Sequence, residues 1–506
     1  MEKLNGEQLV LRADADTQIG AGHLMRCLAL AQAWEDAGGE VTFITVCQGE
    51  GMLQRLRDEE FNIKILANSY PDKTDWNTTR GILAGHPGAW MVLDGYNFDD
   101  DYQRRVKEAG HRLLVIDDTA PLKHYYADII LNQNLHAEQL RYVCEPYTRL
   151  LLGTRYVLLR REFLAWKEWH RDIPEVARRV LVTLGGGDPE NNTLKVTHAL
   201  QEVDIPGLEA TAVIGASNPH ASFLEQAAKQ SRIPIRLMRD VKNMPELMAW
   251  ADVAVSGGGT TAWELLFLET PALFLMAAEN QRYVAECIED QGLGKKLGQA
   301  ENVSTALLTR TITSLLKDSN LRATISRKAR QIVDGQGAQR VISSMQKPST
   351  GELKLRPATF DDCRLLWEWA NDPVVRACSF DTASISWDEH VNWFRQRLDS
   401  PRSLLYIIIN DRGVPIGQVR FDLDSAGNAE VGISIAAAER TQGYGGTALR
   451  LACQRVARES GIGKVLAHIK EDNSASIGAF SEAGFIDCGV CVFKQRRAIE
   501  MVWQQK

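Results

Sequence analysis

The stretch that most constrains this chain is residues 9 to 34, where a short apolar run is followed by glycines and then by helical spacing. The apolar run reads as a strand, Gly20-Ala21-Gly22 reads as a turn, and His23 opens a helix in which Leu24 and Leu28 share a face. A strand, a glycine turn and a helix start form the first half of a βαβ unit. Such turns present backbone N–H groups at the carboxyl edge of a parallel sheet, where ligands bind. The stretch therefore predicts an α/β fold with His23 beside a ligand site.

His23 has a structural and a chemical interpretation. The turn lacks the third glycine of the dinucleotide fingerprint, and a histidine near a helix start is often only structural. A helix amino terminus favours the neutral imidazole, whereas Asp14, if it reaches the ring, would orient it and stabilise the protonated form. Because these opposed influences suit a general base near neutral pH, we expect His23 and Asp14 to take part in catalysis.

Further apolar runs follow, and they read as strands. They lie at residues 41–46, 63–66, 90–94 and 113–118. Buried parallel strands have this pattern, and functional side chains stand at their carboxyl ends. The alternation of strands and helices predicts a Rossmann-like half. Tyr96 follows the strand that ends at Asp94, and it is either a substrate contact or a loop aromatic half buried against the next helix.

A second α/β half begins near Arg179. Its predicted strands lie at residues 180–184, 210–215, 251–256 and 272–276. The first of them runs into Gly185, and the third runs into Gly257-Gly258-Gly259-Thr260-Thr261. Consecutive glycines let the backbone approach a ligand closely, and the helix start beyond them offers N–H groups to a diphosphate. Such a turn stabilises the charge of a leaving group without a metal.

Several separated motifs occur together in one enzyme family. They are Arg12-x-Asp14, Ile19-Gly20-x-Gly22-His23-x-Met25-Arg26-Cys27, Asp94-Gly95-Tyr96 and Ser256-Gly257-Gly258-Gly259-Thr260-Thr261. Over roughly residues 7 to 345, the chain resembles the UDP-sugar hydrolases of pseudaminic acid biosynthesis. The resemblance implies two Rossmann-like halves in a GT-B-like arrangement, with the nucleotide bound mainly by the second half. It also implies release of UDP from UDP-2,4-diacetamido-2,4,6-trideoxy-β-L-altropyranose.

The resemblance assigns roles to individual residues. His23 would take a proton from the water that attacks C1 with inversion, while UDP departs into the glycine-rich turn. Tyr96 would touch the sugar and Glu264 the ribose hydroxyls, although Glu264 could also be a solvated helix residue. Asn280 and Gln281 would bind the sugar or a phosphate, unless they are only polar loop residues. The remaining predicted substrate contacts are Gly22, Gly185, Gly257, Gly258, Gly259, Thr260 and Thr261.

The length and net charge of the chain limit the number of its domains and the classes of protein to which it can belong. Because 506 residues exceed what one core supports, we expect three domains, at 1–176, 177–345 and 353–506, with 346–352 as a linker. The net charge of −7 argues against a nucleic-acid-binding surface. No apolar run approaches the roughly 20 residues of a membrane span, and the amino terminus lacks the apolar core of a signal peptide. We expect a soluble, cytoplasmic enzyme without a membrane partner, whose oligomeric state stays open.

The nine cysteines are scattered, which fits reduced thiols rather than a disulfide framework. Cys488-x-x-Cys491 lacks the second ligand pair that a structural zinc site needs. We therefore expect no metal.

The last part of the chain carries two segments of another family. Arg440-Thr441-Gln442-Gly443-Tyr444-Gly445-Gly446-Thr447, after a predicted strand at 430–435, resembles the pyrophosphate turn of GNAT N-acetyltransferases. Asn473-Ser474-Ala475-Ser476 resembles the second acetyl-CoA segment of that family. The resemblance implies a GNAT α/β domain with acetyl-CoA as the donor, and a bare glycine loop is the alternative. The predicted cofactor contacts are Val431, Ile433, Arg440, Gln442, Gly443, Tyr444, Gly445, Gly446, Thr447, Asn473 and Ser476.

One segment indicates which molecule accepts the acetyl group. Trp369-Ala370-Asn371-Asp372-Pro373-x-x-Arg376 resembles the first helix of the acetyltransferases of the same pathway, although Ala370 replaces their usual arginine. Those enzymes acetylate the 4-amino group of UDP-4-amino-4,6-dideoxy-N-acetyl-β-L-altrosamine, and their product is the substrate implied for the first part of the chain. Glu430 is the candidate base, through a water, although a structural strand carboxylate is nearly as good an interpretation; His390 could contact the sugar or nucleotide. Phe480 replaces a frequent tyrosine and donates no proton, so the proton donor to the thiolate is unassigned.

Two alternatives stay open. The two activities could serve a related diamino sugar, for example one destined for another nonulosonic acid or a surface polysaccharide. The carboxyl-terminal domain could also bind acyl-CoA without catalysis, which Phe480 permits.

Overall fold

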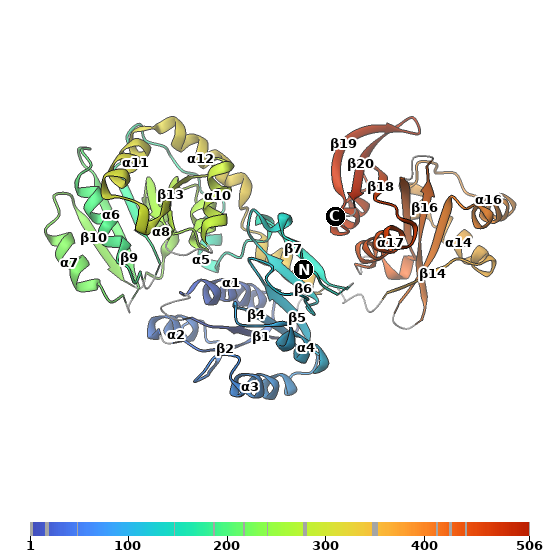
Figure 1. The fold of residues 1–506 in the computed structure, drawn as a ribbon, viewed down its shortest axis with the longest axis horizontal. Coiled ribbons are helices and arrows are strands. Elements are labelled where there is room, and N and C mark those ends of the chain that lie inside the picture. Colours follow the sequence, from blue (N-terminus) through green and yellow to red (C-terminus); the bar gives the residue numbers. More distant parts are fainter. Residues whose placement is uncertain are drawn as a thin grey trace. The chain divides into compact units, whose positions relative to one another are not determined.

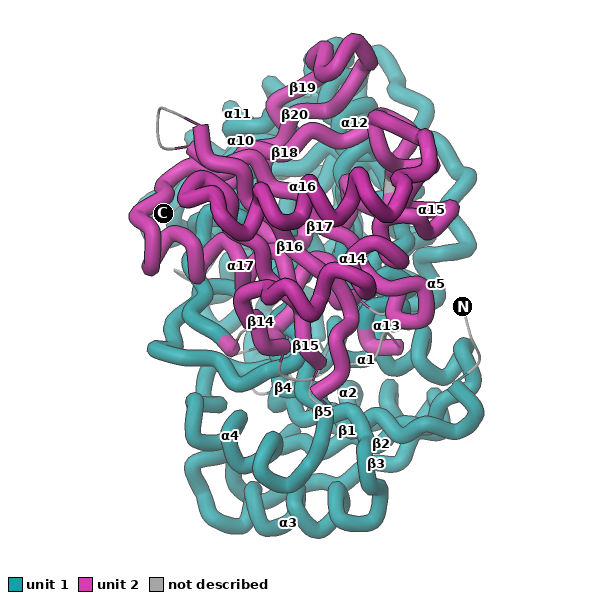
Figure 2. The backbone as a smooth tube through the Cα atoms, turned by 90° about the vertical axis from the view of Figure 1, so that its right-hand side faces the viewer, with its two compact units in different colours: residues 1–144, 150–344 teal, residues 145–149, 345–506 magenta. Residues whose placement is uncertain are grey.

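The structure is a computed structural model. It describes residues 4–15, 20–47, 49–145, 147–185, 188–215, 218–239, 241–276, 281–346, 353–410, 413–424, 428–440 and 443–504. The chain divides into two compact units, the first with residues 1–144 and 150–344 and the second with residues 145–149 and 345–506 (Figure 2). Of the predicted linker, Gln346 is the last residue of a helix, and residues 347–352 lie outside the described residues.

The first unit contains two sheets. The first sheet has seven strands in the order β3-β2-β1-β4-β5-β6-β7 (Figure 1). Its strands are β1 (Gln8–Ala13), β2 (Glu40–Thr45), β3 (Asn62–Ile65), β4 (Trp90–Asp94), β5 (Arg112–Ile116), β6 (Ile129–Asn132) and β7 (Arg149–Leu152). Its helices are α1 (Gly22–Asp36), α2 (Glu50–Arg57), α3 (Lys73–Ala84) and α4 (Asp100–Glu108). The pairs from β3 to β6 are parallel, so their carboxyl ends meet at one edge.

Apolar burial holds this sheet between helices. Val10, Met91 and Leu113 from the central strands pack with Leu83 of α3 and Val106 of α4 in one buried cluster. Helix α1 lies on the other side of the sheet (Figure 1). Strand order reverses direction between β1 and β4, and such a switch point opens a crevice beyond the carboxyl ends of the strands. The loops after β1 and β4 are therefore placed to build a site.

The second sheet repeats this topology with six strands in the order β10-β9-β8-β11-β12-β13. Its strands are β8 (Arg179–Thr183), β9 (Glu209–Ile214), β10 (Ile235–Arg239), β11 (Val253–Ser256), β12 (Ala272–Met276) and β13 (Lys295–Gln299). The helices from this part onward are α5 (Arg161–Leu164), α6 (Asn192–Gln201), α7 (Ala221–Lys229), α8 (Met244–Trp250), α9 (Thr261–Phe267), α10 (Arg282–Asp290), α11 (Thr305–Lys317), α12 (Ser319–Ile332) and α13 (Gly337–Gln346). The switch point lies between β8 and β11, where the predicted glycine turn follows β11.

The second unit has one seven-stranded sheet in the order β14-β15-β16-β17-β18-β20-β19. Its strands are β14 (Lys354–Pro357), β15 (Ser403–Ile409), β16 (Pro415–Leu423), β17 (Ala429–Ile435), β18 (Lys464–Lys470), β19 (Ile486–Phe493) and β20 (Arg496–Gln504). Its helices are α14 (Cys363–Ala370), α15 (Pro373–Cys378), α16 (Trp387–Asp399), α17 (Tyr444–Ser460) and α18 (Ser474–Glu482). All pairs are antiparallel except β17 with β18, which pair in parallel only at Ala429 with Val465 and at Glu430 with Leu466. The two strands therefore diverge beyond Glu430.

The predicted architecture is confirmed: two Rossmann-like halves with parallel sheets precede an α/β domain whose sheet is mostly antiparallel. The structure groups the two halves in one unit, and the predicted boundary at 176/177 falls just before β8. Among the described residues, no helix is both long and apolar enough to cross a membrane.

Candidate active site

His23 lies where the sequence places it, at the carboxyl edge of the first sheet. It is the second residue of α1, and its side chain is 8% exposed. No side chain caps the start of this helix. The ring Nδ1 lies 2.5 Å from Oδ1 of Asp94, the last residue of β4. The switch point between β1 and β4 thus joins these two side chains.

Asp94 is buried and shared between His23 and Arg26. Arg26 donates from Nε to Oδ2 of Asp94 at 2.6 Å and from Nη2 to Oδ1 at 2.7 Å. Burial by itself would raise the pKa of Asp94, but the charges and hydrogen bonds of Arg26 and His23 outweigh it and hold that pKa well below its usual range. An ionised carboxylate only accepts hydrogen bonds, so the Nδ1 of His23 carries the ring proton. Nε2 is then the basic nitrogen of the neutral ring, which is the arrangement of a general base held in one tautomer.

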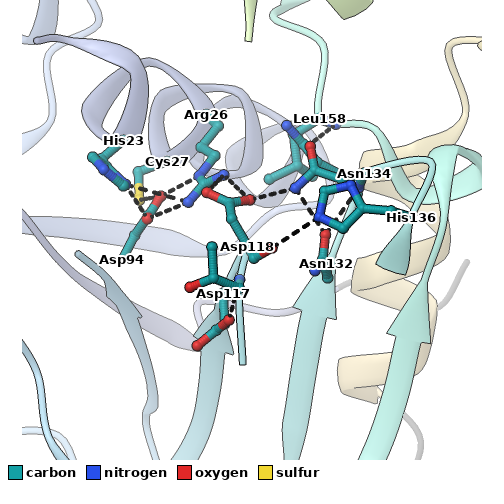
Figure 3. A network of polar contacts seen from close by, with 12 residues as sticks. His23, Arg26, Cys27, Asp94, Asp117, Asp118, Asn132, Asn134, His136 and Leu158 are labelled. Carbon is teal, nitrogen blue, oxygen red and sulfur yellow. Dashed lines mark hydrogen bonds and ion pairs between the residues drawn. The ribbon is translucent and has the colours of Figure 1, made fainter. Parts of the chain in front are cut away.

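A chain of polar contacts extends this pair along the sheet edge (Figure 3). Arg26 also donates from Nη1 to Oδ1 of Asp118 at 2.9 Å, and Asn134 donates to the same oxygen at 2.7 Å. Nε2 of His136 lies 3.2 Å from the main-chain oxygen of Asp118. Burial opposes the ionisation of Asp118, but the charge of Arg26 prevails and lowers its pKa. Arg26 is therefore locked between two carboxylates.

Asp14 does not have the predicted role of orienting His23. Its Oδ2 accepts a hydrogen bond from Arg12 at 2.9 Å, and its Oδ1 accepts one from the backbone N–H of Val46 at 2.7 Å. Arg12 is fully buried and also bonds to Asp75, so it holds Asp14 toward β2. The carboxylate on the ring is Asp94 instead.

Tyr96 faces the site from the loop after β4. Its ring meets the ring of His23 edge-on, with centroids 5.0 Å apart, and its side chain is half exposed. This placement favours the substrate-contact interpretation over a loop aromatic buried against the next helix.

A cavity of about 390 Å³ is lined by residues from both Rossmann-like halves of the first unit. Its volume lies in the range of small-molecule sites. The predicted site residues that line it are Gly22, His23, Tyr96, Gly185, Gly257, Gly258, Gly259, Thr260, Thr261, Glu264 and Gln281. The structure therefore brings together all the substrate residues predicted for this part of the chain except Asn280, which lies outside the described residues, and Asp14 is not among the lining residues.

The glycines of the turn after β11 serve different purposes. A Cβ at Gly259 would meet nothing within 4 Å, so a ligand can come close to the backbone there. A Cβ at Gly258 would lie 2.9 Å from the main-chain oxygen of Gln281, so this glycine permits close packing of the chain on itself. Gly185 lies elsewhere, in the loop after β8, and has a φ of +97°, which favours glycine.

Glu264 lies in the cavity wall and is paired with an arginine that the sequence did not indicate. Nη2 of Arg160 donates to its Oε1 at 2.8 Å. Burial raises the pKa of Glu264, although Arg160 opposes the shift. The pair argues against a solvated helix residue.

Sequence reasoning assigned no role to Asp94, Arg26, Asp118, Asn134 and Arg160. Two sequence patterns could have indicated roles for Arg26 and for the two aspartates. Arg26 follows His23 by three residues and so shares its helix face, and Asp94 and Asp118 stand at the carboxyl ends of apolar runs. Arg160 carries no such signal, because it precedes a four-residue helix and reaches Glu264 only in the folded chain.

The predicted acetyl-CoA turn precedes helix α17 of the second unit. Gly443 is the N-cap of α17 with a φ of +82°, so glycine is favoured there. Gly446 is required for a different reason, since its Cβ would lie 2.9 Å from the Cβ of Glu482 on α18. Arg440 donates to the main-chain oxygen of Ile435 at 3.1 Å and pairs with Asp372 at 2.7 Å, while Gln442 lies outside the described residues.

The other predicted cofactor residues surround this turn. Val431 and Ile433 lie on β17, and Gly445 and Thr447 lie in the first turn of α17 with Tyr444. Asn473 accepts a hydrogen bond from the backbone N–H of Ser476 at 3.1 Å and so caps α18.

Glu430 stands where β17 and β18 diverge. Its side chain is 45% exposed, and its Oε1 lies 3.7 Å from Nδ1 of His468 on β18. A carboxylate in this position is open to a ligand that enters between the two strands.

Two side chains of this unit belong to its interior. His390 is 2% exposed, its Nε2 lies 3.1 Å from the main-chain oxygen of Cys363, and its ring stacks on Phe394. The structure therefore gives His390 a packing role in place of the alternative contact with the sugar or nucleotide. Phe480 is buried against Phe485 with ring centroids 4.9 Å apart.

Two family descriptions match parts of the chain. Residues 352–486 match the acetyltransferase (GNAT) domain, and residues 188–342 match the glycosyltransferase family 28 C-terminal domain. The second match covers the half that carries the glycine turn after β11.

Three relatives align over long ranges. A protein of Methanocaldococcus jannaschii described as uncharacterized is 25% identical, covering 94% of this chain and 96% of the relative. The spore coat polysaccharide biosynthesis protein SpsG of Bacillus subtilis is 24% identical, covering 66% of this chain and 96% of the relative. The UDP-2,4-diacetamido-2,4,6-trideoxy-beta-L-altropyranose hydrolase of Campylobacter jejuni is 24% identical, covering 56% of this chain and 97% of the relative. The chain is an enzyme that joins a part similar to UDP-sugar hydrolases to a GNAT acetyltransferase domain.

Proposed function

We propose that the first unit hydrolyses UDP-2,4-diacetamido-2,4,6-trideoxy-β-L-altropyranose with inversion at C1. The observation that carries the proposal is His23, bonded through Nδ1 to Asp94 and facing a cavity that also contains the glycine turn of the second sheet. The similarity to the Campylobacter hydrolase supports the choice of substrate.

In the proposed reaction, Nε2 of His23 takes a proton from water as the water oxygen bonds to C1. The bond between C1 and the diphosphate oxygen breaks, and UDP leaves with the electron pair. Backbone N–H groups after Gly259 face the diphosphate and stabilise its charge. Asp94 holds the ring in the required tautomer and stabilises the imidazolium that forms.

Within the cavity, Tyr96 contacts the sugar and Glu264 contacts the ribose hydroxyls. The half-exposed ring of Tyr96 beside His23 supports the first assignment, and the position of Glu264 in the cavity wall supports the second. Gln281, with Asn280, binds the sugar or a phosphate.

We further propose that the second unit transfers the acetyl group of acetyl-CoA to the 4-amino group of UDP-4-amino-4,6-dideoxy-N-acetyl-β-L-altrosamine. The GNAT match and the N-cap geometry of Gly443 support acetyl-CoA binding at the start of α17. The amine nitrogen bonds to the thioester carbon, the carbon–sulfur bond breaks as coenzyme A leaves as a thiolate with the electron pair, and the amine proton passes through water to Glu430. The product is the substrate of the first unit, so acetylation precedes hydrolysis.

A related diamino sugar is the second candidate substrate. The similarity to a spore coat polysaccharide biosynthesis protein over 66% of this chain favours it specifically. Rates on matched UDP-sugar epimers separate the two candidates.

One assay tests both activities. The purified chain is given UDP-4-amino-4,6-dideoxy-N-acetyl-β-L-altrosamine with and without acetyl-CoA, and products are followed by mass spectrometry and NMR. We expect UDP and the free 2,4-diacetamido sugar only when acetyl-CoA is present. If the chain hydrolyses a separately prepared diacetylated UDP-sugar but never acetylates the amine, the second unit is a binding module or acts on another amine.

A further inference from the structure

Three side chains with metal-ligating atoms meet on neighbouring strands of the second unit. His468 on β18 pairs directly with Glu500 on β20, and Cys491 on β19 pairs with Ala498, two residues before Glu500. Residues at such positions share one face of a sheet. One ligand atom from each of His468, Cys491 and Glu500 lies within 4.8 Å of the others. We call these three residues the β18–β20 cluster.

The spacing in this cluster fits a cation better than a direct hydrogen bond. Nε2 of His468 and Oε2 of Glu500 are 3.5 Å apart. An N–H···O hydrogen bond spans about 2.7–3.2 Å. Two nitrogen or oxygen ligands about 2.0–2.1 Å from a tetrahedral zinc are about 3.4 Å apart.

The second ring nitrogen of His468 lies near a carboxylate, although beyond hydrogen-bond distance. Nδ1 is buried and has no hydrogen-bond partner among the described residues, and the carboxylate of Glu430 lies 3.7 Å away. A histidine that binds a metal through one nitrogen usually directs the other toward a carboxylate. Phe493 stacks on the ring of His468 with centroids 4.0 Å apart and planes at 7°, which fixes its orientation.

The strand β19, which carries Cys491, is an exposed and irregularly paired element. This strand is the edge of the sheet, and Ile486, Val490 and Val492 are 69%, 57% and 78% exposed. Its pairing with β20 is irregular between Asp487 and Val490. β19 therefore has a strand partner on one side alone, and its regular pairing resumes at Val490, just before Cys491.

We propose that His468, Cys491 and Glu500 bind one Zn²⁺ ion that fastens β19 to β20 and β18. A thiolate, an imidazole and a carboxylate suit zinc, whereas Mg²⁺ and Ca²⁺ select oxygen ligands. Three protein ligands leave the fourth position to water. The expectation that no metal binds rested on the sequence pair Cys488 and Cys491, but the sheet instead brings Cys491 to residues from two other strands.

The test uses the full chain after treatment with a chelator, with Co²⁺ as an optical probe. We expect a thiolate-to-cobalt absorption band that saturates at one equivalent and disappears when Zn²⁺ is added. Cys491→Ser should abolish the band and weaken Zn²⁺ binding at least about tenfold. Cys488→Ser is the matched control, because this exposed thiol lies outside the cluster, and it should retain the band.

A second readout covers the case in which Cys491→Ser perturbs folding. Zn²⁺ should raise the melting temperature of the wild type and of Cys488→Ser but not of His468→Gln, which keeps the thiol. The proposal is overturned if the wild type shows no cobalt–thiolate band at one equivalent, or if the band survives Cys491→Ser. Because neither readout uses a sugar or acetyl-CoA, this result is independent of the proposed catalytic function.

Discussion

At the scale of single residues, the site depends on which carboxylate holds the ring of His23. Asp94→Asn removes the ionised acceptor of the Nδ1 proton and lets the ring adopt the other tautomer. We expect kcat for UDP release to fall about 10²- to 10⁴-fold, while UDP affinity changes little. Steady-state kinetics with a UDP-binding measurement check this.

Asp14→Asn is the matched control for that substitution. Asp14 bonds to Arg12 and Val46, so its amide variant should keep most of kcat once the melting temperature confirms a folded chain. An equal loss of kcat in both variants would contradict the assignment of Asp94.

The same network predicts how stability depends on pH. The pKa of Asp94 lies well below its ordinary value of 3.8, because Arg26 and His23 outweigh the effect of burial. A carboxyl whose pKa is lowered by folding contributes stability that is complete above its unfolded pKa and is lost as pH falls toward its folded pKa. We therefore expect the free energy of unfolding to drop below about pH 4 and Asp94→Asn to show a shallower drop. Urea midpoints at stepped pH measure both slopes, and identical slopes would contradict the prediction.

At the scale of elements, alanine substitutions at two glycines distinguish the effect of close packing on stability from the effect of helix propensity. A Cβ at Gly39 would lie 2.1 Å from Nε1 of Trp34, a fully buried side chain of α1. Gly39→Ala should therefore lower the free energy of unfolding by about 1–3 kcal/mol. Gly81 lies within α3, and its Cβ would meet nothing within 4 Å, so Gly81→Ala should raise stability by about 0.5–1 kcal/mol. Chemical denaturation measures the free energy of unfolding of both variants. Changes of the same sign in the two variants would contradict the packing argument.

At the scale of the whole molecule, two compact units predict two separable activities. His23→Ala should stop UDP release and let the acetylated UDP-sugar accumulate. Gly443→Trp should strain the N-cap of α17 and obstruct the acetyl-CoA turn, so acetylation stops while a supplied diacetylated UDP-sugar is still hydrolysed. Mass spectrometry of both reactions follows these outcomes. Loss of both activities in either folded variant would show that the units depend on each other.

Much of the architecture could be predicted because many buried strands appear in the sequence as apolar runs. The strands β2, β4, β8, β9 and β12 lie within two residues of their predicted positions. The sequence analysis did not predict β10 and β13, which are edge strands that are half exposed and carry polar residues, and it also did not predict the short buried strand β6. The glycine turns were also visible, although Gly258 and Gly446 serve close packing within the chain.

By itself, the sequence determined the alternation of strands and helices, the place of His23 after β1 and the two glycine turns, because these features depend on local periodicity and backbone freedom. Only the tertiary structure decided which partners the side chains meet. Asp14 follows β1 and Asp94 ends the neighbouring parallel strand β4, and the choice between them depended on Arg12 drawing Asp14 toward β2. The pair of Arg160 with Glu264 and the β18–β20 cluster arise in the same way, since pairing across distant segments leaves no periodic signal in the chain.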